Sequence, residues 1–278
     1  MAQGLSQRSS CKLAGISRRA FALQPAPDRN AGLREALRRV WRPNMGYRMA
    51  WGFLREEFAP LNPKRVHRLW KEEGLGRVKR YRKKRTGNTV PLRAEAPNHV
   101  WCVDFCFDSC LNGTKLKVLA IVDEFSKELL ALEVGTSFKS LKVQSVLARL
   151  FAQRGAPQFL RSDNGSEFAS RSLAVFLLRS GSQSRFIAPG SPWQNAHAES
   201  FVSRLRAELL DVEVFHNLAD AQLRLGLYLR FYNEQRPHSS LGYRTPAVAA
   251  AQWAGSGRAT PSLLLPIAMS SSGGSLTF

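Results

Sequence analysis

The feature that most constrains this chain is a change in the spacing of its apolar residues near residue 99. Over 99–107, large apolar side chains occupy every second position, the period of a β-strand: Trp101, Val103, Phe105 and Phe107. Apolar runs predict further strands at 115–125, 128–135, 157–165 and 183–189. Helices are expected at 140–154 and 171–181, and two more after 191. This order predicts an α/β domain, a mixed five-stranded sheet with flanking helices.

Most of the positive charge lies before that domain. The 278 residues include 41 Lys or Arg and 21 Asp or Glu, a net charge of +20. Residues 1–98 hold 23 of these basic residues and 7 of the acidic ones, whereas 99–250 hold 17 and 14. So uneven a balance indicates a polyanionic partner, most simply nucleic acid. Hydrophobic residues make up 44% of the chain, which excludes global disorder.

The basic front predicts short helices at 29–41, 47–58 and 61–76. In the third, Asn62 is placed to cap the helix, Pro63 suits its first position, and Gly74 ends it. The last two helices suggest a helix-turn-helix, and a plain helical bundle is the alternative. Four basic residues lie off the apolar stripe of 61–76 and are candidate DNA contacts: Lys64, Arg65, Arg68 and Lys71.

A strongly basic run follows at 77–85 and leads into a proline-containing linker up to residue 98. Such a run is expected to follow phosphates or to join domains, through Lys79, Arg80, Arg82, Lys83, Lys84 and Arg85. The expected organisation is a helical DNA-binding region at 1–76, a basic linker at 77–98, an α/β core at 99–252 and a flexible tail at 253–278.

Other features exclude several classes of protein. The four cysteines cannot staple so long a chain, because three of them fall within 102–110. Buried small hydrophobes are the favoured interpretation over a zinc site, since no second ligand pair exists. No apolar run is long enough for a membrane span, and no secretory signal is recognisable. A cytoplasmic protein is expected.

Three carboxylates are candidates for one site. Asp104 lies within an apolar strand, Asp163 ends the fourth strand at a turn, and Glu199 projects from a helix whose start is capped by 191–194. If they converge, they would repel one another unless they hold divalent metal, and Mg²⁺ prefers such ligands. Scattered surface acids are the alternative, with five competitors: Asp108, Asp123, Glu124, Glu167 and Asp211. Arg206, seven residues after Glu199, would lie roughly 10.5 Å along the same helix.

Several segments together resemble bacterial transposases of the insertion sequence three type, the second-frame proteins related to retroviral integrases. Within the core these are WCVDF (101–105), RSDNGSEF (161–168) and SPWQNAHAESFVSRLR (191–206). Residues 228–249 resemble the close of the family's core, and 45–75 resemble its helix-turn-helix. Thirty-five residues separate Asp163 from Glu199, the interval that names the acid triad of this superfamily.

The resemblance implies an RNase H-like core in which Asp104, Asp163 and Glu199 bind two Mg²⁺ or Mn²⁺ ions. It implies cleavage at the ends of an insertion element and strand transfer by the freed 3′-hydroxyl. The implied partners are double-stranded DNA of the element ends and target, further copies of this chain on that DNA, and a first-frame protein or frameshift fusion. Arg206 matches a DNA-contacting position, and Asn195 and His238 also fall on family motifs.

Two other functions stay open from the sequence. A DNA-binding regulator with an idle core would use the same basic front without its upstream partner. A nuclease acting on RNA·DNA hybrids would share the fold. The intact acids argue against the first alternative, and the helix-turn-helix and the acid spacing argue against the second.

Overall fold

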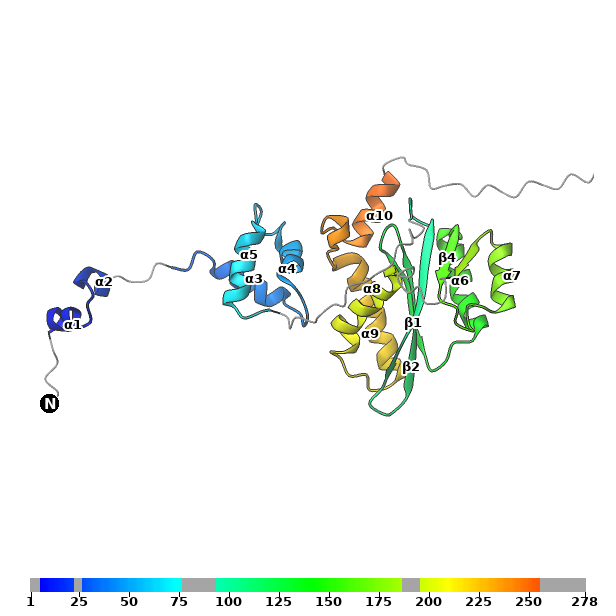
Figure 1. Cartoon of the computed structure of the whole chain (residues 1–278), viewed down its shortest axis with the longest axis horizontal. Coiled ribbons are helices and arrows are strands. Elements are labelled where there is room, and N and C mark those ends of the chain that lie inside the picture. Colours follow the sequence, from blue (N-terminus) through cyan, green and yellow to red (C-terminus); the bar gives the residue numbers. More distant parts are fainter. Residues whose placement is uncertain (1–5, 23–26, 77–93, 187–195, 256–278) are drawn as a thin grey trace, which may run out of the picture. The chain divides into compact units, whose positions relative to one another are not determined.

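The structure is a computed structural model and describes residues 6–22, 27–76, 94–186 and 196–255. Its chain divides into two compact units, 1–39 and 40–278. The first contains α1 (Gln7–Leu13), α2 (Arg18–Ala22) and nearly all of α3 (Ala31–Val40), on which Leu33, Ala36 and Leu37 are buried (Figure 1). The predicted boundaries at 76, 98 and 252 remain predictions.

The second unit begins with α4 (Tyr47–Leu54) and α5 (Pro63–Glu72), the two predicted helices of the helix-turn-helix. The Asn62 side chain accepts a hydrogen bond from the Lys64 backbone N–H at 2.8 Å, so the predicted cap of α5 is confirmed. Val66, Leu69 and Trp70 form the buried side of α5. Its four predicted DNA contacts are all exposed on the rest of the helix surface.

The sheet is mixed and five-stranded, in the order β3-β2-β1-β4-β5. Its strands are β1 (Val100–Ser109), β2 (Lys115–Asp123), β3 (Leu129–Gly135), β4 (Phe159–Ser162) and β5 (Gln183–Phe186). The first three pair antiparallel through short connections, whereas β4 and β5 join in parallel after helical crossovers. The predicted fold class is confirmed, and β1 lies at the centre with partners on both sides.

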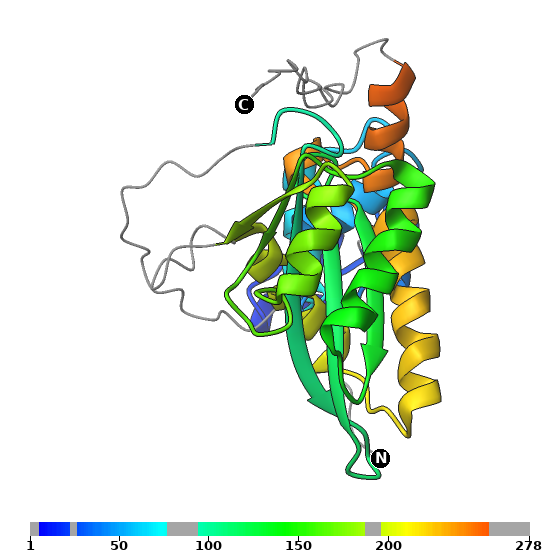
Figure 2. The ribbon, with the colours of Figure 1, turned by 90° about the vertical axis from the view of Figure 1, so that its right-hand side faces the viewer.

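Helices cover both faces of this sheet because both faces of its central strands are apolar. Trp101 and Val103 pack with α6 (Ser140–Arg154) and α7 (Arg171–Arg179), which lie in front of the strands in Figure 2. Cys106 packs on the opposite face with α8 (Ala196–Leu205) and α9 (Leu218–Arg230). The face assignment of β1 from its alternation is therefore confirmed, although Phe107 at the far end is exposed.

Some predicted bounds differ from the structure. The helix expected over 47–58 ends at Leu54, and a single further turn places the Phe58 N–H 3.0 Å from the Leu54 carbonyl oxygen. Pro60 disfavours helical backbone at Ala59 and supplies no N–H of its own, so it limits how far a helix could continue, but it does not explain the end at Leu54. The helix after residue 191 changes to a π-helical turn at Arg206–Leu210. A second π-helical turn, Phe231–Gln235, follows α9 and precedes α10 (Pro246–Gly255).

Three sequence predictions lie outside the described residues. They are the basic run at 77–85, the helix cap at 191–194 and most of the tail after residue 253. No helix in the described part of the chain is long and apolar enough to cross a membrane.

Candidate active site

Asp104 lies at the middle of the central strand, half-buried on the face that α8 covers. The neighbours on that face, Cys102 and Cys106, are fully buried against apolar side chains. The Asp104 carboxylate accepts a hydrogen bond from the Phe105 backbone N–H at 2.8 Å. An apolar strand thus fixes this carboxylate and leaves its outer oxygen toward the helix side of the sheet.

Asp163 follows β4 directly, and the strand register brings it level with Asp104. Because Cys102 pairs with Arg161 across the parallel β1 and β4, the next positions on the same face are Asp104 and Asp163. The Asp163 side chain is exposed and accepts the Gly165 backbone N–H at 3.1 Å. A Cβ on Gly165 would lie 3.0 Å from the same carboxylate oxygen, so the turn needs glycine for close approach.

Glu199 lies in the first turn of α8, where the helix dipole favours a negative charge. Buried Ala198, Phe201 and Leu205 hold this helix against the sheet and set the direction of Glu199. Its side chain is partly exposed. The carboxylate therefore comes from a helix packed across the strands that carry Asp104 and Asp163.

The pKa of Asp104 is raised by its surroundings. Burial is the main cause, the negative charges of Asp163 and Glu199 add to it, and together they raise the pKa from 3.8 to about 6. The hydrogen bond from Phe105 acts in the opposite direction. The three acids selected from the sequence thus lie on neighbouring elements, β1, the end of β4 and α8, and their action as one site stays a prediction.

The donor set suits a hard divalent cation, because three carboxylates that repel one another gain from a shared positive charge. Within the described ranges, no three His, Cys, Asp or Glu side chains are already grouped closely enough to hold a metal ion. The backbone thus aligns the acids, and their side chains would have to turn inward to share a cation.

Two of the competing acids, Asp123 and Glu167, have structural partners. Asp123 accepts backbone N–H groups of Asn98, Phe125 and Ser126 and closes the turn between β2 and β3, as expected of a strand-ending acid. Glu167 forms an ion pair with Lys117. Each of these two carboxylates is therefore occupied within the fold.

The predicted DNA-contacting residues differ in how the structure places them. Lys64, Arg65, Arg68 and Lys71 are exposed on α5, and Arg68 lies 3.6 Å from Glu72. Arg206 donates a hydrogen bond to the Phe107 carbonyl oxygen at 3.0 Å, beside the exposed end of β1. The six residues of the basic run, from Lys79 to Arg85, lie outside the described ranges. DNA contact by these side chains stays a prediction.

The four cysteines and His238 are buried and are interpreted as structural residues. All four cysteines are free and buried, which confirms the interpretation as small hydrophobes. Burial raises the pKa of the Cys102 and Cys106 thiols, so neither is a ready nucleophile. Burial lowers the pKa of His238 to about 2, and its ring meets Tyr232 edge-on. His238 is thus a neutral packing residue.

A buried charged group beside the acids is not predicted from the sequence. The sequence presents Glu124 only as a strand-closing competitor and does not single out Arg161 or His197. Arg161 and Glu124 form an ion pair in which both side chains are almost fully buried. An arginine inside the apolar strand segment 159–162 was the available signal, since a buried charge requires a partner.

Three family models match the chain. Two describe an integrase core domain, over residues 94–192 and 180–246, and one describes a helix-turn-helix-like domain over 27–85. The insertion element IS407 uncharacterized 31.7 kDa protein of Burkholderia multivorans is 37% identical, over 89% of this chain and 91% of its own length. This chain belongs to the insertion-element transposase family.

Other family members agree with that assignment. The insertion element IS476 uncharacterized 39.2 kDa protein of Xanthomonas euvesicatoria is 37% identical, over 90% of this chain and 73% of its own length. The transposase InsD for insertion element IS2 of Escherichia coli is 29% identical, over 73% of this chain and 72% of its own. The core of this transposase-family chain is thus of the polynucleotidyl transferase type.

Solved structures give weaker matches. The simian T-cell lymphotropic virus intasome in complex with the PP2A regulatory subunit B56 gamma aligns at 15% identity and a TM-score of 0.49, over 69% of this chain and 67% of that one. The HTLV-2 integrase catalytic core domain in complex with magnesium aligns at 19% identity and 0.45, over 57% and 99%. The fold assignment therefore rests on the sheet order and the matched integrase core models.

Proposed function

We propose that this chain cleaves DNA at the ends of an insertion element and joins the freed 3′-hydroxyl to target DNA. The observation that supports the proposal is the placement of the three acids: Asp104 lies on β1, Asp163 directly follows the neighbouring β4, and Glu199 lies on α8, which packs against β1. The family assignment supports it, because relatives over most of the chain include a named transposase. The acids are proposed as the Asp-Asp-Glu triad of the reaction.

Two Mg²⁺ or Mn²⁺ ions at these carboxylates would supply activation of the attacking hydroxyl and stabilisation of the leaving oxygen at phosphorus. Asp104 would contribute a carboxylate fixed in the central strand. Asp163 would contribute one from the adjacent turn, and Glu199 one from α8. The carboxylates would also orient the scissile phosphate between sheet and helix, and no covalent bond between protein and DNA is needed.

The proposed DNA interface combines three regions. Exposed basic residues of α5 would contact phosphates or a groove of the element end, the run at 77–85 would follow the backbone, and Arg206 would approach DNA beside the acids. Further copies of this chain are proposed to assemble on paired DNA ends. A first-frame protein or a fusion to it is proposed to complete recognition of those ends.

The test is a joining assay with a short duplex of the element end, an exposed 3′-hydroxyl and a supercoiled target plasmid. We expect joining in Mg²⁺ or Mn²⁺, and loss of joining in Glu199→Gln. The matched control is Glu133→Gln. Glu133 lies on β3 and pairs with Arg149 on α6, so this change should leave joining unchanged. Duplex binding without nicking or joining in either metal would instead favour the DNA-binding regulator and refute the enzyme.

A further inference from the structure

The ion pair between Glu124 and Arg161 is almost completely buried. The Arg161 side chain is 6% exposed and the Glu124 side chain 4%. Desolvation of two charges offsets most of their attraction, and a well-packed apolar pair often stabilises a fold at least as much. Stability alone therefore does not account for this pair, and its location offers another role.

Glu124 contacts all three elements that carry the candidate catalytic acids. Its Oε2 accepts hydrogen bonds from Arg161 on β4 and, at 3.6 Å, from the Cys102 thiol on β1. Its Oε1 lies 3.5 Å from Nε2 of His197 on α8. Each partner stands two residues before one of the acids, in the pairs Cys102 and Asp104, Arg161 and Asp163, and His197 and Glu199.

The two-residue spacing between each partner of Glu124 and its acid means that the two residues move together. Two residues apart on a strand, side chains share a face and are separated by roughly 6.6 Å of stiff backbone. Two residues along a helix differ by a rise of about 3 Å and by about 200° around the axis, so His197 and Glu199 lie on different sides of α8 and move together as parts of one rigid helix. A shift of any partner against Glu124 would therefore move the acid beyond it by a similar amount.

Glu124 is itself held at a fixed place. Its backbone N–H donates to the Val100 carbonyl oxygen at 2.9 Å, and its Oε1 accepts the Ala94 backbone N–H at 3.3 Å. Lys127 closes the group, because its ammonium donates to the Glu124 carbonyl oxygen and lies 3.2 Å from Nδ1 of His197. The segment after β2 thus ties α8 to the sheet at the level of the acids.

We propose that Glu124 is a positioning residue that holds β1, β4 and α8 at the spacing that Asp104, Asp163 and Glu199 need to share divalent metal. The proposal rests on the proposed function of those acids. Glu124 itself touches neither metal nor DNA. Its role is to act through Cys102, Arg161 and His197.

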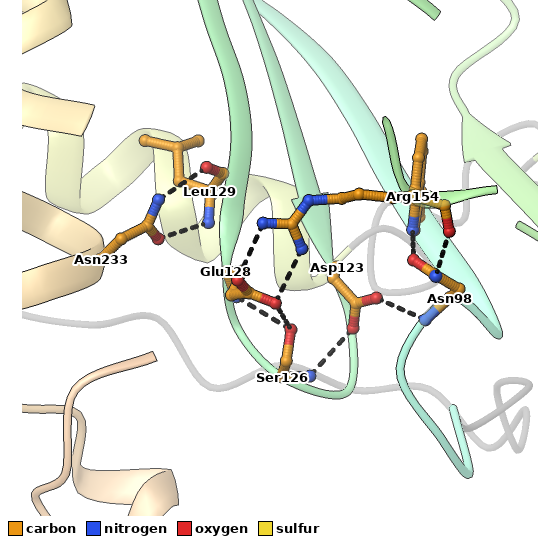
Figure 3. A network of polar contacts seen from close by, with 8 residues as sticks. Asn98, Asp123, Ser126, Glu128, Leu129, Arg154 and Asn233 are labelled. Carbon is orange, nitrogen blue, oxygen red and sulfur yellow. Dashed lines mark hydrogen bonds and ion pairs between the residues drawn. The ribbon is translucent and has the colours of Figure 1, made fainter. Parts of the chain in front are cut away.

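Glu128 provides a matched control, shown in Figure 3. It is buried at the opposite end of the same turn and accepts two hydrogen bonds from Arg154, each at 3.0 Å. Its ion pair joins the start of β3 to the end of α6, and neither element carries one of the acids. Glu128→Gln should therefore perturb an ion pair whose carboxylate is also buried, although its arginine is 40% exposed, without moving the acids.

The experiment measures Mn²⁺ affinity of the purified full chain by electron paramagnetic resonance, with thermal denaturation in parallel. We expect wild type to bind Mn²⁺ and Asp104→Asn to lose that binding. Glu124→Gln should weaken affinity about tenfold, as substitutions behind metal ligands do, and Glu128→Gln by less than about twofold. If the two glutamine variants lose the same thermal stability but only Glu124→Gln loses Mn²⁺ affinity, the loss of affinity is due to positioning and not to a general loss of structure.

A double variant, Glu124→Gln with Arg161→Met, removes both charges and keeps the fold even if the single change does not. Mn²⁺ affinity that stays weak while thermal stability recovers supports positioning. Affinity that returns to the wild-type value, or Glu124→Gln that binds as tightly as wild type, overturns it. If wild type shows no Mn²⁺ binding that depends on Asp104, the proposed function fails and the positioning role falls with it.

Discussion

Replacement of Asp104 by asparagine should make the metal-free protein more stable. The pKa of Asp104 is raised from 3.8 to about 6, by burial first and then by repulsion from Asp163 and Glu199. Because the folded-state pKa lies above the unfolded value, stability falls as pH rises from about 4 to about 6 and stays lower above that range. A shift of about two units corresponds to about 3 kcal/mol. Solvent reaching the half-buried group reduces the expected gain to about 1–3 kcal/mol.

The assay is thermal denaturation at pH 8 in the presence of a chelator. The expected gain corresponds to a rise of roughly 2–8 °C in the melting temperature of Asp104→Asn over wild type. Glu234→Gln, at an exposed position away from the sheet, is the control and should change stability by less than about 0.5 kcal/mol. A lower melting temperature for Asp104→Asn would refute the reasoning, because it would mean that the carboxylate is stabilised by its surroundings.

Addition of Mg²⁺ to the same samples should reverse the order. Wild type would gain stability through binding to the folded state only, whereas Asp104→Asn would gain little. The same change thus stabilises the metal-free protein and removes its response to metal. A Mg²⁺ response of equal size in both proteins would place the ion elsewhere.

Three smaller predictions follow from local geometry. Asn62→Ala should cost about 1 kcal/mol of stability, read from urea unfolding, because it removes the cap of α5; an unchanged midpoint contradicts this. Lys64→Ala should weaken duplex binding in a salt titration and reduce its slope by about one; an unchanged slope means no phosphate contact. Gly165→Ala should lower joining about tenfold with little effect on the melting temperature. The added methyl group would displace the Asp163 carboxylate by a few tenths of an ångström. Joining at the wild-type rate would refute the importance of that contact.

The parts of the fold that the sequence predicts well are those with a strong local period. Alternation placed Trp101 and Val103 on one face of β1 and Asp104 on the other, and both packing clusters agree. Asn62, Pro63 and Gly74 marked α5 because capping and turn geometry are local properties. The sequence also allowed Asp104 and Asp163 to lie on neighbouring strands, and the parallel register of β1 and β4 agrees.

Other features depend on partners distant in sequence and were not predictable. The contacts of the Glu124 carboxylate with Cys102, Arg161 and His197 form only when β1, β4 and α8 pack together in the fold. Arg206 lies in a π-helical turn and donates to Phe107, so its expected place on a continuous α-helix was wrong in detail. No local pattern in 196–210 distinguishes the two helix types.

The order of elements along the chain sets the order in which the site can assemble during synthesis. The central strand with Asp104 is made early, but its parallel neighbour begins only at Phe159 and the helix with Glu199 only at Ala196. The basic front therefore leaves the ribosome well before the third acid exists. A chain that stops short of α8 would keep α4 and α5 but lack Glu199, so the proposed triad would be incomplete.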